Sequence, residues 1–288
     1  TDLYSYRTSA AAWSRVGPAA SIVHTERAIA ATGTDQSMAD IATLDGVTVV
    51  AWEDSRGGLW WSIVEQVTGR VIRPASVLAI GGTCPRVVRT VDRLMVLWLD
   101  APGGRIMAWP VDLSALNVPV VPVVVTADLS TAHPYFDAQA SSVTGLGSPA
   151  LIAWVVATGF RVGYVDAAGA LASSPAVASW ATAAAGPISV AMVDATDPYG
   201  DTVVGVSVST ATEIETWILS APLLTFDHAT GTPITGAGAP AVRLASTFTT
   251  DGAVTSGAQT TVSLIVWAEY AGATDRDAQV YAGSLTPD

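Results

Sequence analysis

The chain has 288 residues, half of them apolar and only 13% charged, and its formal net charge is −12. An acidic surface repels phosphate backbones, so no nucleic-acid partner is expected. The single cysteine, Cys84, excludes an internal disulfide and a Cys-x-x-Cys metal site.

Short segments typical of half-exposed β-strands recur along the chain, 46 to 66 residues apart. These segments are Leu3–Thr8, Leu59–Glu65, Arg105–Asp112, Phe160–Asp166, Glu213–Ser220 and Gln279–Leu285. Glycine, proline and aspartate fill the gaps around them, which is typical of hairpin turns. The first feature of the chain is therefore a repeated β-hairpin.

A more uniformly apolar run precedes five of these segments, as expected for strands covered on both faces. The runs are Val47–Asp54, Leu94–Asp100, Ala150–Val156, Thr202–Val208 and Ser263–Glu269. Four of them carry a tryptophan at the same place, namely Trp52, Trp98, Trp154 and Trp267, and the Thr202–Val208 run has Val206 there. We expect these side chains to pack between neighbouring repeats.

Weaker runs before and after each pair supply a first and a fourth strand, as at 37–46 and 69–78. Four strands repeated at this spacing predict an all-β propeller of four-stranded antiparallel blades. We expect one domain over 1–288 with five blades, the alternative being six. In the five-bladed arrangement, residues 12–23 complete the C-terminal blade. The start at Thr1 favours a processed or excised product over a nascent chain.

The stretch "VVAWEDSRGG", followed by "LWWSIVEQVTGRVI", resembles a repeat of secreted or surface-anchored bacterial β-propeller proteins with a W-x-D-x-R strand motif. The resemblance is good over 47–80 and partial over 94–113 and 150–171, where Arg56 has no equivalent. It implies a propeller outside the cell or on its surface. Phage tail propellers have a similar lysine-poor composition and remain an alternative.

Two groups of residues near this motif are candidate ligand contacts. Either Asp54 and Arg56 face a ligand, or Asp54 binds the turn backbone and Arg56 pairs with a carboxylate. Trp60 and Trp61 are adjacent, so they face opposite sides of a strand. One should pack inside the blade, while the other either stacks on a sugar ring or lies beneath a neighbouring blade.

First strands line the axial channel of a propeller, so their polar residues are natural ligand candidates. Asp40 and Arg86 each lie twelve residues before the tryptophan of their repeat. Asp137 and Arg243 fall in the corresponding runs. The alternative is that these four residues pair with one another or with channel water.

A glycoside hydrolase needs two carboxylic acids facing one pocket. The candidates are Asp40, Asp137, Glu213 and Glu269, and nothing in their spacing selects a pair. The sequence predicts no cofactor. Asp194–Asp201 contains three carboxylates that could approach a Ca²⁺ ion, but an ordinary turn explains them without one.

These observations favour a non-catalytic extracellular or cell-surface module that binds a protein or a glycan or builds a larger assembly. The alternatives are a glycoside-hydrolase-like propeller enzyme, with carboxylates at the axial channel, and a phage structural or receptor-binding component. No membrane span is expected, because prolines interrupt the most apolar stretches.

Overall fold

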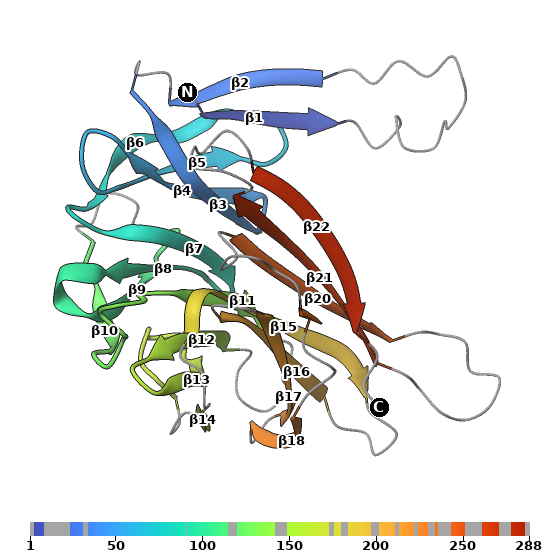
Figure 1. Cartoon of the computed structure of the whole chain (residues 1–288). Coiled ribbons are helices and arrows are strands. Elements are labelled where there is room, and N and C mark those ends of the chain that lie inside the picture. Colours follow the sequence, from blue (N-terminus) through green and yellow to red (C-terminus); the bar gives the residue numbers. More distant parts are fainter. Residues whose placement is uncertain are drawn as a thin grey trace, which may run out of the picture.

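Figure 1 shows the protein as a computed structural model, in which the described elements are strands and one short 3-10 turn. The described residues are 3–8, 24–30, 34–90, 92–114, 120–141, 149–172, 176–179, 184–196, 202–210, 213–221, 224–229, 234–235, 243–250, 261–270 and 278–285. On several of these strands only the backbone is described. Within the described part of the chain, no helix is long and apolar enough to cross a membrane.

The strands form six antiparallel sheets, five of which follow one another as blades. A separate hairpin pairs β1 (Leu3–Thr8) with β2 (His24–Ala30). Blade 1 comprises β3 (Gln36–Leu44), β4 (Val47–Asp54), β5 (Leu59–Glu65) and β6 (Val71–Ala79). Blade 2 comprises β7 (Thr83–Arg89), β8 (Leu94–Asp100), β9 (Arg105–Val111) and β10 (Val123–Thr126), with the 3-10 turn η1 (Ala101–Gly103) between β8 and β9.

Blades 3 and 4 repeat this order of strands, and the described part of blade 5 has three strands. Blade 3 comprises β11 (Phe136–Ala140), β12 (Ala150–Val156), β13 (Gly159–Val165) and β14 (Ala176–Ser179). Blade 4 comprises β15 (Ala184–Thr196), β16 (Thr202–Thr210), β17 (Glu213–Ala221) and β18 (Thr225–Ala229), and β19 (Ile234–Thr235) also pairs with β17. Blade 5 comprises β20 (Arg243–Thr250), β21 (Thr261–Tyr270) and β22 (Ala278–Leu285).

Successive blades meet at their first strands, which we call the inner strands: β3, β7, β11, β15 and β20. Figure 1 shows the blades following one another in a fan from β3 to β22. The described residues do not close this fan into a ring. The prediction of an all-β propeller with four-stranded antiparallel blades is confirmed. Residues 12–23, which we expected to complete the last blade, lie outside the described part of the chain.

Apolar side chains fill the space between neighbouring blades. The layer between blades 1 and 2 contains Trp61 and Trp98, and the layer between blades 2 and 3 contains Trp154. Trp61 meets Trp109 of blade 2 edge to face, with ring centroids 4.5 Å apart. The apolar runs are therefore buried on both faces, and a single blade could not hide them alone.

Two β-bulges set the direction of polar side chains on the inner strands. Met38 and Cys84 both have φ near 51°, and the pairing with the second strand of each blade slips by one residue beside them. Because alternate residues face opposite sides of a strand, one inserted residue moves the later side chains of the strand to the opposite face. Asp40 consequently faces blade 2, and Arg86 faces blade 3.

Replacement of Trp154 tests the packing between blades. Trp154 is fully buried, and Trp154→Ala should lower the free energy of unfolding by about 3–5 kcal/mol through the cavity that it leaves. Urea denaturation followed by circular dichroism measures this loss. Val121→Ala is the control, since Val121 is 70% exposed and its loss should leave stability unchanged. An equal effect of the two variants would contradict the proposed packing.

Candidate functional site

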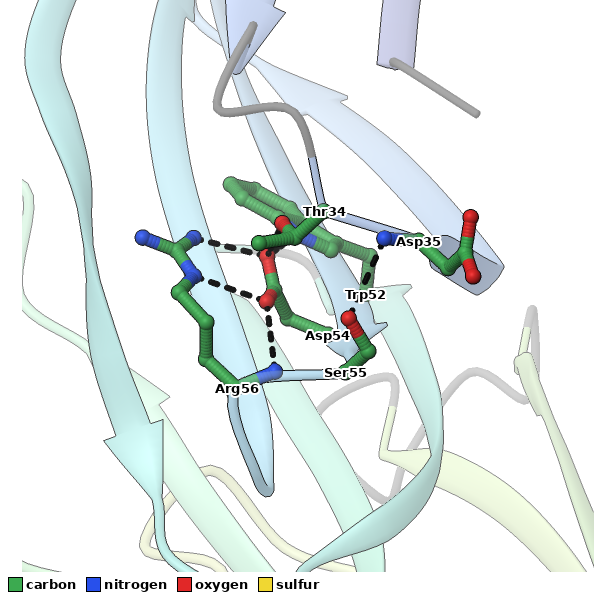
Figure 2. Close-up of polar contacts among 6 residues, drawn as sticks. All are labelled: Thr34, Asp35, Trp52, Asp54, Ser55 and Arg56. Carbon is green, nitrogen blue, oxygen red and sulfur yellow. Dashed lines mark hydrogen bonds and ion pairs between the residues drawn. The ribbon is translucent and has the colours of Figure 1, made fainter.

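The turn after β4 is held by the carboxylate of Asp54 (Figure 2). The Asp54 Oδ1 accepts hydrogen bonds from Arg56 N and Nε at 3.0 and 2.7 Å, and Oδ2 accepts one from Arg56 Nη2 at 2.7 Å. The Thr34 hydroxyl and the Trp52 indole also donate to Oδ2, at 3.3 and 3.5 Å. Both oxygens of this carboxylate are thus occupied by the protein itself.

These contacts favour the charged forms of Asp54 and Arg56. The hydrogen bonds from the Arg56 side chain hold the pKa of Asp54 well below its usual range, and Asp54 in turn raises the pKa of Arg56. The Asp54 side chain is fully buried. The turn therefore carries a preformed ion pair, as the structural interpretation of the motif requires, while a ligand role for Asp54 and Arg56 remains untested.

Aspartate–arginine pairs also occur in the next two blades, although their arginines lie at another offset from the tryptophan than Arg56 does. In blade 2, Asp100 pairs with Arg105, which lies opposite it across the hairpin, and Arg105 Nε is 2.9 Å from Asp100 Oδ2. In blade 3, Asp128 accepts a hydrogen bond from the Trp154 indole at 2.9 Å and pairs with Arg161 at 2.7 Å. Arg56 has no equivalent at its own position in these repeats, and the pairs there use arginines from the third strand of the blade.

The two adjacent tryptophans are both engaged within blade 1. Trp61 is 1% exposed and belongs to the layer between blades 1 and 2. Trp60 is partly buried, and the Arg56 guanidinium lies 3.5 Å from its ring centroid. Trp61 therefore offers no surface for a sugar ring, and Arg56 covers a face of Trp60.

A second polar group links the inner strands of blades 1 to 4. Asp40 Oδ2 accepts a hydrogen bond from Val87 N at 2.8 Å, so the carboxyl group of β3 reaches β7. Arg86 on β7 pairs through Nε with Asp137 Oδ1 on β11, at 2.7 Å. Asp40, Arg86 and Asp137 thus lie in one group, and Arg86 pairs with Asp137 as the alternative to a ligand role states. Ligand binding by these residues stays a prediction.

Asp137 continues the series into blade 4. Its Oδ2 accepts hydrogen bonds from Ser189 Oγ at 3.2 Å and from Val190 N at 3.0 Å. We call Asp40, Arg86, Asp137 and Ser189 the inner-strand cluster. The side chains of Arg86 and Asp137 are 27% and 17% exposed, so solvent still reaches the cluster.

Burial and neighbouring charges shift the pKa values of Asp40 and Arg86 in opposite directions. Burial raises the pKa of Asp40 above its usual value, which hydrogen bonds from Val87 N and Ile41 N and the charge of Arg86 only partly offset. Burial alone would lower the pKa of Arg86, but the adjacent Asp137 carboxylate raises it overall. Asp40 is thus a carboxyl group whose surroundings favour the protonated form.

Other candidates fall outside the part of the structure that describes side chains. Arg243 begins β20, Glu213 begins β17 and Glu269 lies in β21, but only their backbone positions are described. Much of the Asp194–Asp201 segment lies outside the described residues, so Ca²⁺ binding there stays a prediction. Among the described residues, no three histidine, cysteine or carboxylate side chains are grouped as metal ligands.

Sequence reasoning missed two residues of this region. Ser189 was not identified because no strong repeat signal marks the first strand of blade 4. Glu53, at the end of β4, accepts a hydrogen bond from Cys84 N of blade 2 at 2.7 Å. A charged residue at the end of an otherwise apolar strand was the signal that could have found it.

No protein-family model and no curated protein matches the sequence. Structures of similar arrangement include the catalytic domain of a GH62 α-L-arabinofuranosidase from Coprinopsis cinerea, at 9% identity and TM-score 0.46, with 87% of this chain and 90% of that chain covered. AofleA from Arthrobotrys oligospora has 9% identity and TM-score 0.46, with 92% of this chain and 79% of that chain covered. CoXyl43, a GH43 β-xylosidase/α-arabinofuranosidase from a compost metagenome, has 8% identity and TM-score 0.44, with 90% of this chain and 93% of that chain covered.

These comparisons correct the leading sequence prediction. Most of the similar structures are named as glycoside hydrolases, whereas the sequence favoured a non-catalytic binding or assembly module. That prediction is wrong by this comparison, and the enzyme alternative is the better supported of the two. The comparisons give no support to the surface-repeat resemblance or to a phage origin. At this level of similarity, the activity of the chain itself has to be argued from its own residues.

Replacement of Asp54 should change how stability depends on pH. Because the pKa of Asp54 is lowered in the folded protein, its stabilising effect is present above the ordinary pKa and is lost as pH falls through the lowered one. Asp54→Asn should therefore cost about 2–3 kcal/mol at pH 7, and the loss should shrink towards pH 2. Thermal unfolding at several pH values measures both effects.

The matched control is Asp45→Asn. Asp45 is exposed in the β3–β4 turn, and asparagine tolerates its positive φ of 51°. This variant should unfold like the parent protein at every pH. A pH-independent effect of Asp54→Asn, or an effect no larger than that of Asp45→Asn, would contradict the role of the ion pair.

Proposed function

We propose that the protein is a glycoside hydrolase that acts on a neutral saccharide at the inner-strand cluster, with Asp40 as the proton donor and Asp137 as the partner carboxylate. The observation that carries the proposal is the contrast between two carboxyl groups on different blades. Burial favours the protonated form of Asp40, while a guanidinium and two neutral donors surround Asp137. Such a contrast divides acid and base roles between two carboxyl groups.

The chemistry of glycoside cleavage requires this division. A protonated carboxyl group donates its proton to the leaving oxygen, and a carboxylate supports the positive charge that develops on the sugar ring or activates the attacking water. The Asp40 carboxyl is oriented by hydrogen bonds from Ile41 N at 2.9 Å and Val87 N at 2.8 Å. These two hydrogen bonds lower the pKa of Asp40, but burial raises it by more. We assign the acid role to Asp40 on this net direction and the second role to Asp137.

The contacts of Arg86 favour a neutral substrate. Its Nε binds Asp137, and its Nη1 donates to Pro85 O at 3.1 Å, so the guanidinium is committed to the protein. A substrate carboxylate would have to compete with Asp137 for this arginine, in a protein of net charge −12. The proposed substrates are therefore uncharged saccharides.

The similar structures named above include an α-L-arabinofuranosidase and a β-xylosidase/α-arabinofuranosidase in complex with xylotriose. The proposal assigns the same broad class of substrate to this chain, but the argument comes from Asp40, Arg86 and Asp137. An extracellular or cell-surface location belongs to the proposal, since polymeric glycans are met there. The proposed unit is a single propeller domain over 1–288.

The proposal is tested with neutral aryl pentosides and hexosides and with neutral polysaccharides, by following released phenol or new reducing ends. The parent protein should hydrolyse at least one of them. Asp40→Asn should lower kcat by about 10²–10⁴-fold, because an amide cannot donate the proton in its place, and Asp137→Asn should also lower kcat.

The Asp45→Asn variant serves again as the control, since its carboxyl group lies in a distant turn of blade 1. It should retain full activity. Circular dichroism must show that both inner-strand variants are folded. No turnover by the parent protein across the panel, or full activity in folded Asp40→Asn, would overturn the proposal.

A further inference from the structure

We propose that Glu53 of blade 1 is a positioning residue: its carboxylate fixes the bulge at Cys84 that turns Arg86 towards Asp137. The catalytic part of this inference rests on the proposed function. Glu53 contacts neither carboxyl group of the inner-strand cluster in the described hydrogen bonds. It acts through the backbone of β7.

The bulge determines which side of β7 carries Arg86. Thr83 lies opposite Leu99 of β8, and Arg86 lies opposite Leu97, so β7 contains one residue more than β8 between these pairs. Leu97 faces the layer between blades 2 and 3, and Arg86 faces the same way, towards Asp137.

A regular strand would place Arg86 differently. Without the extra residue, Arg86 would lie opposite Val96, which faces the layer between blades 1 and 2. Its guanidinium would then point away from blade 3, and Asp137 would lose its cation. The ion pair between Arg86 and Asp137 therefore depends on the bulge.

The bulge itself needs an external support. Cys84 has a positive φ of 51°, a conformation that side chains other than glycine and asparagine rarely adopt. Its N–H donates to Glu53 Oε1 at 2.7 Å. A partly buried carboxylate bonded to a backbone N–H is a strong acceptor, so Glu53 holds the strained residue in place.

The position of Glu53 in the repeat supports a specific role. Glu53 directly follows Trp52, and the residues that follow Trp98 and Trp154 are Leu99 and Val155, both buried. Glu53 lies opposite Leu59, which faces blade 2, so its side chain points at β7. A carboxylate thus stands where blades 2 and 3 have an apolar side chain, beside the inner strand that contributes Arg86 to the cluster.

The test compares Glu53→Ala, Glu53→Gln and Glu65→Ala. The first variant removes the acceptor, the second keeps an amide oxygen that can accept the same hydrogen bond, and the third removes a carboxylate from an exposed pair with Arg70 at the other end of blade 1. Hydrogen exchange reports on the Cys84 amide, and the NMR signal of the Arg86 Nε–H reports on its pairing with Asp137. Neither measurement requires a substrate.

In Glu53→Ala, exchange of the Cys84 amide should accelerate at least tenfold and the Arg86 Nε–H signal should shift, while Glu53→Gln and Glu65→Ala resemble the parent. Against a substrate of the parent protein, Glu53→Ala should lower kcat by about 10- to 100-fold with little change in KM, as expected when a reacting group is misplaced, and Glu53→Gln should restore most of it.

An unchanged Cys84 amide and Arg86 signal in folded Glu53→Ala would overturn the inference. So would an equal loss of kcat in Glu53→Gln and Glu53→Ala. A parent protein without hydrolytic activity would overturn the proposed function alone, because the exchange and NMR measurements would still decide whether Glu53 positions Arg86.

Discussion

The arrangement of the blades depends on hydrogen bonds that pass from a side chain of one inner strand to the backbone of the next. Asp40 accepts from Val87 N, and Asp137 accepts from Val190 N. The apolar layers between blades give most of the stabilisation but little direction, since hydrophobic contact is not directional. The carboxyl groups add that direction, because each accepts a hydrogen bond from a particular main-chain N–H of the neighbouring strand.

The same contacts join the fold to the candidate chemistry. A carboxyl group that bridges two blades is necessarily drawn out of water, and burial is the main cause of the raised pKa of Asp40. At the outer turn the outcome is opposite, because the buried Asp54 meets Arg56 at 2.7 Å. The pKa values of these two aspartates of blade 1 are therefore shifted in opposite directions. The difference is that a cation binds the carboxylate of Asp54 directly.

Much of the fold could be predicted from the sequence, because strand repeats and the recurring tryptophans Trp52, Trp98 and Trp154 follow from local patterns. Asp40 and Arg86 could also be predicted, because each lies twelve residues before the tryptophan of its blade. Each bulge precedes the residue and so does not alter this spacing. The bulges themselves could not be predicted, because Met38 and Cys84 are not residues that favour a positive φ.

The pairing of Asp100 with Arg105 and of Asp128 with Arg161 was also beyond the sequence. Arg105 and Arg161 each lie seven residues after the tryptophan of their blade, whereas Arg56 lies four residues after Trp52. Their aspartates come from different places, because Asp100 ends β8 and Asp128 lies in the loop before β11. Glu53 illustrates the same limit, since its partner Cys84 lies 31 residues further along the chain. Contacts of this kind depend on how two blades are placed, which no local pattern encodes.

In the described hydrogen bonds from a backbone N–H of one blade to a side chain of another, the acceptor lies on the earlier blade. Glu53, Asp40, Asp137 and Gln139 each offer an acceptor to a backbone N–H of the blade that follows, at Cys84, Val87, Val190 and Met192. A polypeptide that emerges from its N-terminal side thus presents finished acceptors before the strand that needs them has been made. Each folded blade thus provides the acceptors that align the next one, which favours assembly in the order of the chain.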